Sequence, residues 1–325
     1  MLFHIGEVTM SKRGSLVYQM QEALKGVFRP GRRRYHDKEH GRNDVIRGIE
    51  TMRCMVADTS QFARFIREQW PQVRNLEDVT PEMALAFIAE QIRRKNSGGY
   101  IGRVITSIRK LDAACRKTGL FTPDRRPLLP YEGEGSIQDF HSDNRPIPHS
   151  DEQAEALITH IAEDDPTVSL VLRTMWVIGL RVNEATYLRV QDIDIETGLI
   201  TLVGNVNHTK GGRPRIVKVQ KTDREFLAKL QSIGEERPDG HIFTSRKSLP
   251  KRAEDHVRKA CQLLNIPPLG THGFRKTFAV DDYRHNLEAG QSDSQALLTT
   301  SRQLGHNRSK VTSDSYVPPQ ARSRD

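Results

Sequence analysis

A stretch rich in proline, glycine and acidic residues near the middle of the chain most constrains the fold. Residues 122–149 (TPDRRPLLPYEGEGSIQDFHSDNRPIPH) show neither the 3.6-residue period of a helix nor the alternation of a strand. Because proline and glycine end regular elements, this stretch predicts a connector rather than part of a core. The 325 residues suffice for two domains. We therefore expect one hydrophobic core on each side of a linker over residues 123–149.

Charge is distributed unevenly around this linker. The chain carries 50 Lys and Arg against 41 Asp and Glu, a net charge of +9. The net charge is +4 over residues 1–50 and +5 over 51–125, falls to −8 over 126–170, and returns to +8 over 171–325. Two basic blocks that flank an acidic one predict two domains that each face a polyanion, with nucleic acid as the leading candidate.

The sequence shows neither a membrane span nor a disulfide framework. No segment approaches the roughly 18 uninterrupted apolar residues of a membrane helix, and the first residues (MLFHIGEVTMSKRG) lack the pattern of a signal peptide. Cys54, Cys115 and Cys261 lie far apart, without a paired-cysteine or Cys/His cluster that could hold zinc. We expect a cytosolic protein, with no membrane association and no structural metal.

The basic residues before the linker divide between a tail and a helical domain. Residues 1–48, which include the run RPGRRR, are predicted to form a flexible basic arm, either a solvated tail or a phosphate-binding segment. Over residues 49–122, apolar residues recur at helical spacing, which predicts a bundle of three or four helices. Basic side chains lie off the apolar stripe of its last helix, and three are candidate DNA-binding residues: Arg103, Arg109 and Lys110.

Residues 150–325 combine helices with a small sheet. Ser150 is a predicted helix cap, and the nearly all-apolar run VSLVLRTMWVIGL predicts a helix buried on most sides. The period changes to two in DIDI, LITLV and IVKV, which predicts antiparallel strands before helices resume at Thr222. The expected fold class is mainly α with a small antiparallel β-sheet (α+β).

Two elements of this second domain carry cationic side chains in defined settings. In GLRVNEATYL, Arg181 precedes Glu184 by one helical turn, a spacing that also occurs in ordinary helix pairs. In HTKGGRPR, flanking glycines let a hairpin tip present Lys210 to a ligand, although surface hairpins often carry lysine for solubility alone. Arg213 and Arg215 on the same hairpin are candidate DNA-binding residues.

Two further elements follow toward the end of the chain. THGFRKTF places His272 and Arg275 three residues apart on one helical face, where both can reach one phosphate. RQLGHNRSKVTSDSYVPP places His306 after a tight turn and Tyr316 ten residues later, where a lone tyrosine would ordinarily be a packing residue. The sequence lacks four common catalytic or metal-binding motifs: a phosphate-binding GxxxxGK(S/T) loop, HExxH, GxSxG and paired cysteines. ATP-driven and metalloprotease chemistry therefore lose support.

In their order and spacing these elements resemble the tyrosine recombinase (phage integrase) family, from about residue 50 onward. The family pattern is Arg, Lys, HxxR, His or Trp, then Tyr, and the local strings GLRVNEATYL, HGFR and LGH also match. The pattern falls on Arg181, Lys210, His272, Arg275, His306 and Tyr316. The resemblance implies a helical core-binding (SAM-like) domain over residues 49–122 and a catalytic domain over residues 150–325 that together grip double-stranded DNA as a C-shaped clamp.

The resemblance also implies a reaction. Tyr316 would attack a phosphodiester to give a covalent 3′-phosphotyrosyl link, while Arg181 and Arg275 hold the phosphate and Lys210 protonates the leaving 5′ oxygen. His272 and His306 would add hydrogen bonds, with His272 a candidate base for Tyr316 and Glu184 a supporting residue. Such enzymes need no metal, ATP or other cofactor, act as tetramers on DNA, sometimes with DNA-bending accessory proteins, and integrate or excise mobile elements.

Two departures from the family pattern stand out. The 31 positions from Arg275 to His306 exceed the usual length, which predicts an enlarged helix or loop within residues 276–303, and Tyr316 lies one residue farther from His306 than usual. Two other functions use the same features: a type IB topoisomerase that relaxes supercoils, and a catalytically inactive DNA-binding or architectural protein. A separate core-binding domain favours recombination over relaxation, and the complete set of six residues argues against loss of catalysis.

Overall fold

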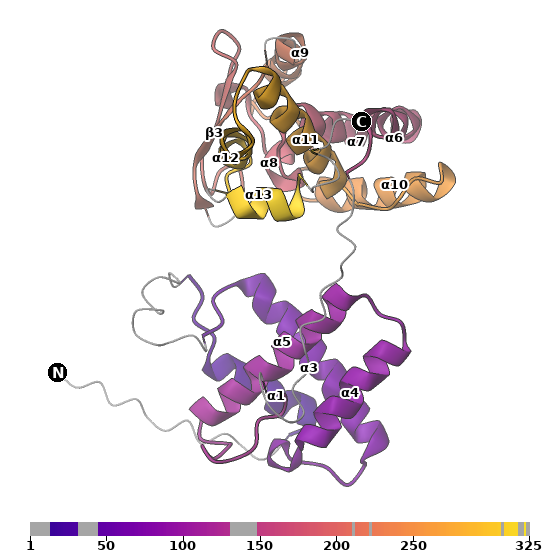
Figure 1. Cartoon of the computed structure of the whole chain (residues 1–325), viewed down its shortest axis with the longest axis vertical. Helices are drawn as coiled ribbons and strands as arrows, with labels where there is room; N and C mark the ends of the chain where they lie inside the picture. The colour runs from indigo at the N-terminus through magenta and orange to yellow at the C-terminus, as the bar shows by residue number, and fades with distance from the viewer. Residues whose placement is uncertain are drawn as a thin grey trace, which may run out of the picture. The chain divides into compact units, whose positions relative to one another are not determined.

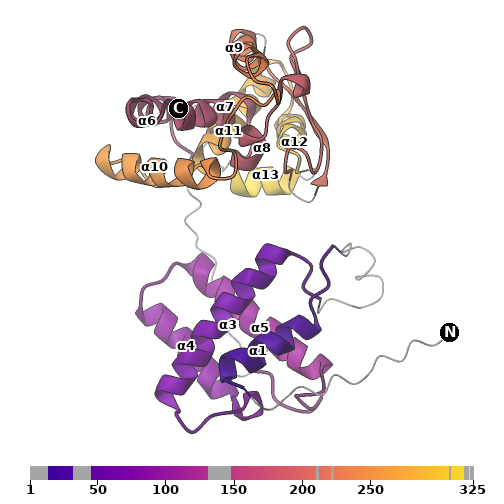
Figure 2. The same ribbon diagram turned by 180° about the vertical axis from the view of Figure 1, so that it is seen from behind.

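The computed structural model describes residues 14–31, 45–130, 148–209, 212–220, 223–306, 309–317 and residue 322. The chain divides into two compact units, residues 1–143 and 144–325. The prediction of a linker over residues 123–149 is wrong at its start, because Leu128 and Leu129 are buried in the core of the first unit. Figures 1 and 2 show both units, and each is described by itself below. None of the helices in the described ranges is long and apolar enough to cross a membrane.

The first unit is a helical bundle. It consists of α1 (Leu16–Gly26), α3 (Ile49–Gln69), the short 3-10 helix η1 (Leu76–Asp78), α4 (Pro81–Arg93) and α5 (Gly98–Lys117). The start of α5 is set by Ser97, whose hydroxyl accepts a hydrogen bond from the Tyr100 N–H, and Pro81 occupies the first turn of α4. Buried side chains of α3, α4 and α5 form one core, as the helical periodicity predicts.

Helix α1 is the main departure from the sequence-based expectation in this unit. Leu16, Met20 and Leu24 recur on one face and are almost fully buried against α3 and α5. After α1, the Arg29 N–H donates to the Ile46 carbonyl at 2.8 Å. The prediction of a flexible arm over residues 1–48 is therefore wrong for residues 16–28, while residues 1–13 and 32–44, with most of the basic run, lie outside the described residues.

The second unit combines helices with a small sheet that lies at one side of the unit (Figures 1 and 2). The strands β1 (Ile193–Asp194), β2 (Leu199–Leu202) and β3 (Arg215–Lys218) are antiparallel in the order β1-β2-β3. The helices are α6 (Asp151–Asp164), α7 (Pro166–Ile178), α8 (Val182–Thr186), η2 (Val190–Asp192), α9 (Arg224–Glu235), α10 (Leu249–Leu263), α11 (His272–Glu288), α12 (Asp293–Gln303) and α13 (Ser309–Ser315). The predicted fold class, mainly helical with a small antiparallel sheet, is confirmed.

Local signals explain several element boundaries in this unit. Ser150 caps α6 in a capping box with Gln153, as its sequence position predicts. Helix α9 begins at Arg224 after Asp223, and Thr222, the predicted start, lies outside the described residues. The long stretch between the HxxR motif and His306 consists of the remainder of α11, a turn with Gly290 at a φ of +85°, and α12.

The buried helix α7 positions the first site residue. It packs against α11 and ends at Gly179, whose φ is +71°. A Cβ at this position would lie 2.3 Å from the Phe278 ring, so only glycine allows the close approach of the two helices. The chain then turns through buried Leu180 and places Arg181 at the N-terminus of α8.

Candidate active site

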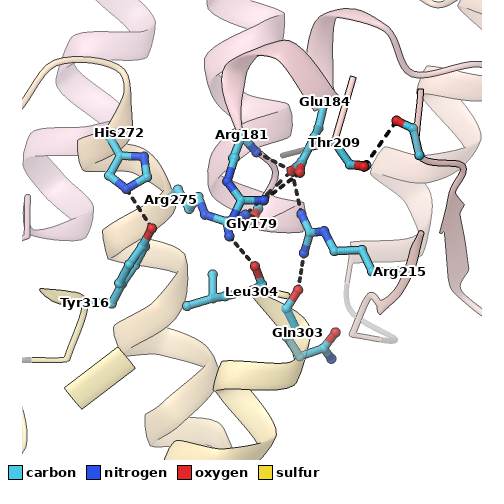
Figure 3. A network of polar contacts seen from close by, with 11 residues as sticks. Gly179, Arg181, Glu184, Thr209, Arg215, His272, Arg275, Gln303, Leu304 and Tyr316 are labelled. Carbon is cyan, nitrogen blue, oxygen red and sulfur yellow. Dashed lines mark hydrogen bonds and ion pairs between the residues drawn. The ribbon is translucent and has the colours of Figure 1, made fainter. Parts of the chain in front are cut away.

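Five of the six residues of the predicted constellation meet in the second unit, and Figure 3 shows most of their contacts. They come from three parts of the fold: the start of α8, the first turn of α11, and the segment from the end of α12 to Tyr316. Lys210, the sixth, lies outside the described residues. Thr209, the residue before it, is buried and donates its hydroxyl hydrogen to the Gly204 carbonyl at 3.1 Å, which holds the base of the hairpin.

Glu184 is the centre of an ion-pair network and is fully buried. It receives the Arg181 N–H at 2.8 Å, Arg181 Nη1 at 2.7 Å and Arg215 Nη2 at 2.6 Å. Arg275 Nη1 lies 3.7 Å away from the same carboxylate. Burial alone would raise the pKa of Glu184, but the surrounding guanidinium groups and the backbone N–H outweigh it and lower that pKa. Glu184 is therefore a carboxylate at neutral pH.

Arg275 is the most deeply buried cation of the site, with no exposed surface. Its Nη1 donates to the Gly179 carbonyl and its Nη2 to the Leu304 carbonyl, so it joins the end of α7 to the end of α12. Its Nε has no hydrogen-bond partner among the residues that the structure describes. Burial, followed by the charges of Arg215 and Arg181, lowers the pKa of Arg275 to about 9, which leaves it charged at neutral pH.

The three guanidinium groups differ in their access to solvent. The Arg181 side chain is 23% exposed, against 9% for Arg215 and none for Arg275. One carboxylate faces three guanidinium groups, so two positive charges are uncompensated within the network. An anion that enters from the exposed side would meet Arg181 first and would offset positive charge in a partly buried site.

Tyr316 lies against this cationic centre and is 6% exposed. Its hydroxyl lies 2.8 Å from His272 Nε2, and the phenol donates this hydrogen bond when the imidazole carries its proton on Nδ1 (Figure 3). The Arg275 guanidinium carbon lies 5.8 Å from the centre of the Tyr316 ring. The His306 ring also packs against the phenol, with ring centres 4.6 Å apart. Histidine and arginine therefore surround the one tyrosine that the sequence predicts to be a nucleophile.

His306 is held as a neutral imidazole in the free protein. Burial, followed by the charges of Arg275, Arg181 and Arg215, lowers its pKa from 6.5 to about 3. Its Nδ1 lies 3.4 Å from the Thr312 hydroxyl, a contact that connects it to α13. A neutral ring can donate one hydrogen bond to an anion without adding a further charge to the centre.

This lowered pKa predicts a pH dependence of stability. An unfolded chain binds the His306 proton near 6.5, whereas the folded protein binds it only near 3, so the unfolded state holds more protons between these values. Stability therefore falls as the pH drops below about 6.5. We expect the chemical shift of the His306 ring in NMR spectra to stay constant from about pH 5 to 8. On acidification, the melting temperature of His306→Asn should fall less than that of the wild-type protein. A midpoint near 6.5 for this resonance would contradict the expectation.

The predicted DNA-binding residues occupy different settings. Arg213 is exposed on the hairpin, as expected for a phosphate contact. Arg103 pairs with the buried Asp58 at 3.0 Å, and Arg109 donates to the carbonyls of Leu129 and Pro130. Lys110 is half-buried. DNA contacts by these four residues stay predictions, and for Arg109 the guanidinium already binds the backbone of its own unit.

Arg215 is placed differently from the expectation that it reaches DNA from the hairpin surface. It pairs across the sheet with Leu202, and it shares the inward face of β3 with buried Val217. Strand alternation therefore directs its side chain toward Glu184 rather than toward solvent. The alternation of IVKV, continued back by one residue to Arg215, predicts this inward position from the sequence.

Metal ligation has little support in the parts of the chain that the structure describes. No group of three or more His, Cys, Asp and Glu side chains gathers there in a way that could hold a metal ion. The cysteines are free: Cys54 is exposed, and Cys115 and Cys261 are buried in the cores of separate units. The site is instead built from cations, one carboxylate, two imidazoles and a phenol.

The fold and the site together define a catalytic domain of the integrase type. The phage integrase family model matches residues 150–321, which is more than half of the chain. The chain therefore belongs to the phage integrase family, the tyrosine site-specific recombinases.

Curated relatives cover most of this chain. It is 27% identical over 275 residues to tyrosine recombinase XerC from Pelobacter propionicus, covering 79% of this chain and 80% of that protein. It is 23% identical over 276 residues to tyrosine recombinase XerD from Halalkalibacterium halodurans, covering 81% and 85%. These names describe the relatives, and both proteins are tyrosine recombinases.

Solved structures share the fold at low sequence identity. A lambda integrase dimer bound to a COC′ core site is similar with a TM-score of 0.61 and 16% identity, covering 94% of this chain and 78% of that one. The XerH site-specific recombinase bound to difH in a pre-cleavage complex is similar with a TM-score of 0.60 and 14% identity, covering 94% and 95%. At this identity the likeness establishes the fold alone.

Proposed function

We propose that this protein cleaves and rejoins DNA strands at specific sites through a covalent link between Tyr316 and a 3′ phosphate. The observation that carries this proposal is the 2.8 Å contact between the Tyr316 hydroxyl and His272 Nε2 beside three buried or half-buried guanidinium groups. A nucleophile, a base and an anion site thus occur within one small region. The solved relatives bound to DNA support DNA as the substrate.

The cationic centre suits a phosphodiester because it supplies the charge that the reaction needs. A phosphodiester carries one negative charge and gains a second as the oxygen of the nucleophile adds to phosphorus. The network holds two uncompensated positive charges, so the binding of the substrate strengthens as the reaction proceeds. Arg181 and Arg275 are the proposed phosphate ligands, because one opens to solvent and the other faces the Tyr316 ring.

The proposed step balances without a cofactor. The Tyr316 oxygen forms a bond to phosphorus, its proton passes to His272, and the bond from phosphorus to the 5′ oxygen breaks. Lys210 is the proposed donor of the proton that the 5′ oxygen takes up, and His306 donates a hydrogen bond to the phosphate. A 5′ hydroxyl from another strand then reverses the step, which exchanges strands rather than hydrolysing them.

Several further features belong to the same proposal. We place the enzyme in the bacterial cytoplasm, at the nucleoid, acting as a tetramer on two duplexes with or without DNA-bending accessory proteins. Both units would contact the duplex, with Arg213 on the catalytic unit as one backbone contact that weakens in salt. The proposed biological role is the integration or excision of a mobile element.

A nicked suicide substrate tests the proposal. Cleavage beside a nick releases a short fragment that carries the 5′ hydroxyl. The reverse reaction then lacks its nucleophile, so the covalent intermediate accumulates. We expect a protein–DNA adduct that survives SDS and forms equally well in EDTA, because no metal enters the step. DNA binding without any adduct, on a duplex that carries the recognised site, would instead support an architectural protein.

A further inference from the structure

Arg215 joins three parts of the catalytic unit at one guanidinium group (Figure 3). Its Nη2 donates to Glu184 Oε2 at 2.6 Å, and its Nη1 donates to the Gln303 carbonyl at the end of α12. A Cβ on Gly305 would lie 2.7 Å from Arg215 Cδ, so the turn before His306 packs directly on this side chain. The φ of Gly305 is +68°, which further favours glycine there.

The same strand is tied to α12 a second time. The Gln303 amide accepts the Lys218 N–H at 3.0 Å and donates to the Lys218 carbonyl at 3.2 Å. Because β3 is an edge strand, this side chain takes the place of a neighbouring strand. The end of α12 is thereby fixed at both ends of β3, and the next residue, Leu304, supplies the carbonyl that holds Arg275.

The charge arrangement gives Arg215 a second task. Its Nη2 lies closer to Glu184 than Arg275 Nη1 does, at 2.6 Å against 3.7 Å. If Arg215 were absent, Glu184 would keep Arg181 and Arg275 as its cationic partners among the described residues. Both groups would then be drawn toward the carboxylate, and the network would hold one uncompensated positive charge instead of two.

We propose that Arg215 is a positioning residue, which holds Glu184 and the end of α12 so that Arg181 and Arg275 are free to bind the scissile phosphate. This inference rests on the proposed function. Arg215 acts through these groups, because both of its Nη atoms donate to protein atoms and the alternation of β3 directs its side chain inward. It therefore differs in role from the exposed Arg213 on the same hairpin.

The test compares Arg215→Met with variants of neighbouring residues on the nicked substrate. We expect Arg215→Met to lower the single-turnover rate of adduct formation on the order of 100-fold, as small displacements of positioning groups do. The dissociation constant for DNA should stay within about twofold of the wild-type value, with an unchanged salt dependence. Lys218→Met, three residues along β3 and exposed, removes a cation without contact to Glu184 and should react at the wild-type rate.

A conservative variant separates positioning from a general effect on folding. Arg215→Lys keeps the charge, but one ammonium cannot reach both Glu184 and the Gln303 carbonyl as the fork of arginine does. Its rate should lie between those of the wild type and Arg215→Met. It also carries the test if Arg215→Met fails to fold, as judged by thermal melting.

A double-mutant cycle with Glu184→Gln tests the coupling directly. If Arg215 acts by restraining Glu184, the double variant should be no slower than Arg215→Met alone, rather than slower by the product of the two effects. Independent effects would overturn the inference, as would weaker DNA binding with a reduced salt slope in Arg215→Met. If Arg215→Met forms the adduct at the wild-type rate, only this inference is overturned. If the wild-type protein itself forms no adduct, the proposed function is overturned.

Discussion

Replacement of Tyr316 by phenylalanine is expected to abolish the covalent adduct with DNA, with a loss of roughly 10⁴-fold or more in cleavage rate, as for other catalytic nucleophiles. The ring of Tyr316 packs in a small cluster with Phe278, Leu304 and Val317, and phenylalanine preserves this packing. Only the hydroxyl and its contact with His272 disappear. DNA affinity and melting temperature should therefore change little, and SDS gels of the nicked substrate measure the effect.

Tyr283 offers a matched control for this variant. It lies in the same cluster, and its hydroxyl donates to Asp293 at 2.6 Å, away from the cationic centre. Tyr283→Phe also removes one phenolic hydroxyl from a buried ring, yet it should form adduct at a rate close to that of the wild type. An adduct in Tyr316→Phe equal to that of the wild type would show that another residue attacks the phosphate.

Replacement of Arg275 by alanine is expected to lower the cleavage rate by roughly 10² to 10³, the range for loss of one preorganised donor to a transition state. The structure adds an effect on stability, because Arg275 is fully buried and its donors satisfy the carbonyls of Gly179 and Leu304. Each buried carbonyl left without a donor costs about 1–3 kcal/mol. We therefore expect a lower melting temperature together with the loss of cleavage, measured on the same preparation.

Two further variants separate these effects. Arg275→Lys retains the charge and one of the carbonyl contacts, so it should melt closer to the wild type while cleavage stays low, since an ammonium cannot bind two oxygens in the fork geometry. Arg284→Ala removes an exposed arginine from the same helix and should leave both properties intact. Cleavage by Arg275→Lys at the wild-type rate would show that charge alone, without the geometry of arginine, suffices.

The parts of the fold that local signals determine could be predicted from the sequence. The apolar run that forms α7 and the glycine that ends it predict the helix and its boundary, because this pattern leaves no polar face and no alternative cap. The change of period from helix to strand likewise predicts the three-stranded sheet. The spacing of His272 and Arg275 places both on one side of α11, although only tertiary packing buries one and exposes the other.

Other features depend on contacts between distant segments. The buried apolar face of α1 consists of four side chains, and its burial requires α3 and α5. So short an apolar pattern beside a basic run does not by itself predict a packed helix. Arg215 combines the charge of a DNA contact with an inward strand position, and Glu184 and the Gln303 carbonyl make that position favourable. The lowered pKa of His306 results from burial, followed by the charges of three arginines that are far apart in sequence. A local sequence motif cannot predict this pKa, because it depends on tertiary packing.

In the proposed mechanism Tyr316 becomes linked to a 3′ phosphate, and the identity of the linked residue tests this most directly. The adduct trapped on a nicked duplex can be digested with nuclease and trypsin, and its peptides mapped by mass spectrometry. We predict a single nucleotide-bearing peptide, VTSDSYVPPQAR, with the 3′-phosphate linkage on Tyr316. Linkage to another residue, or to a 5′ phosphate, would contradict the proposed mechanism.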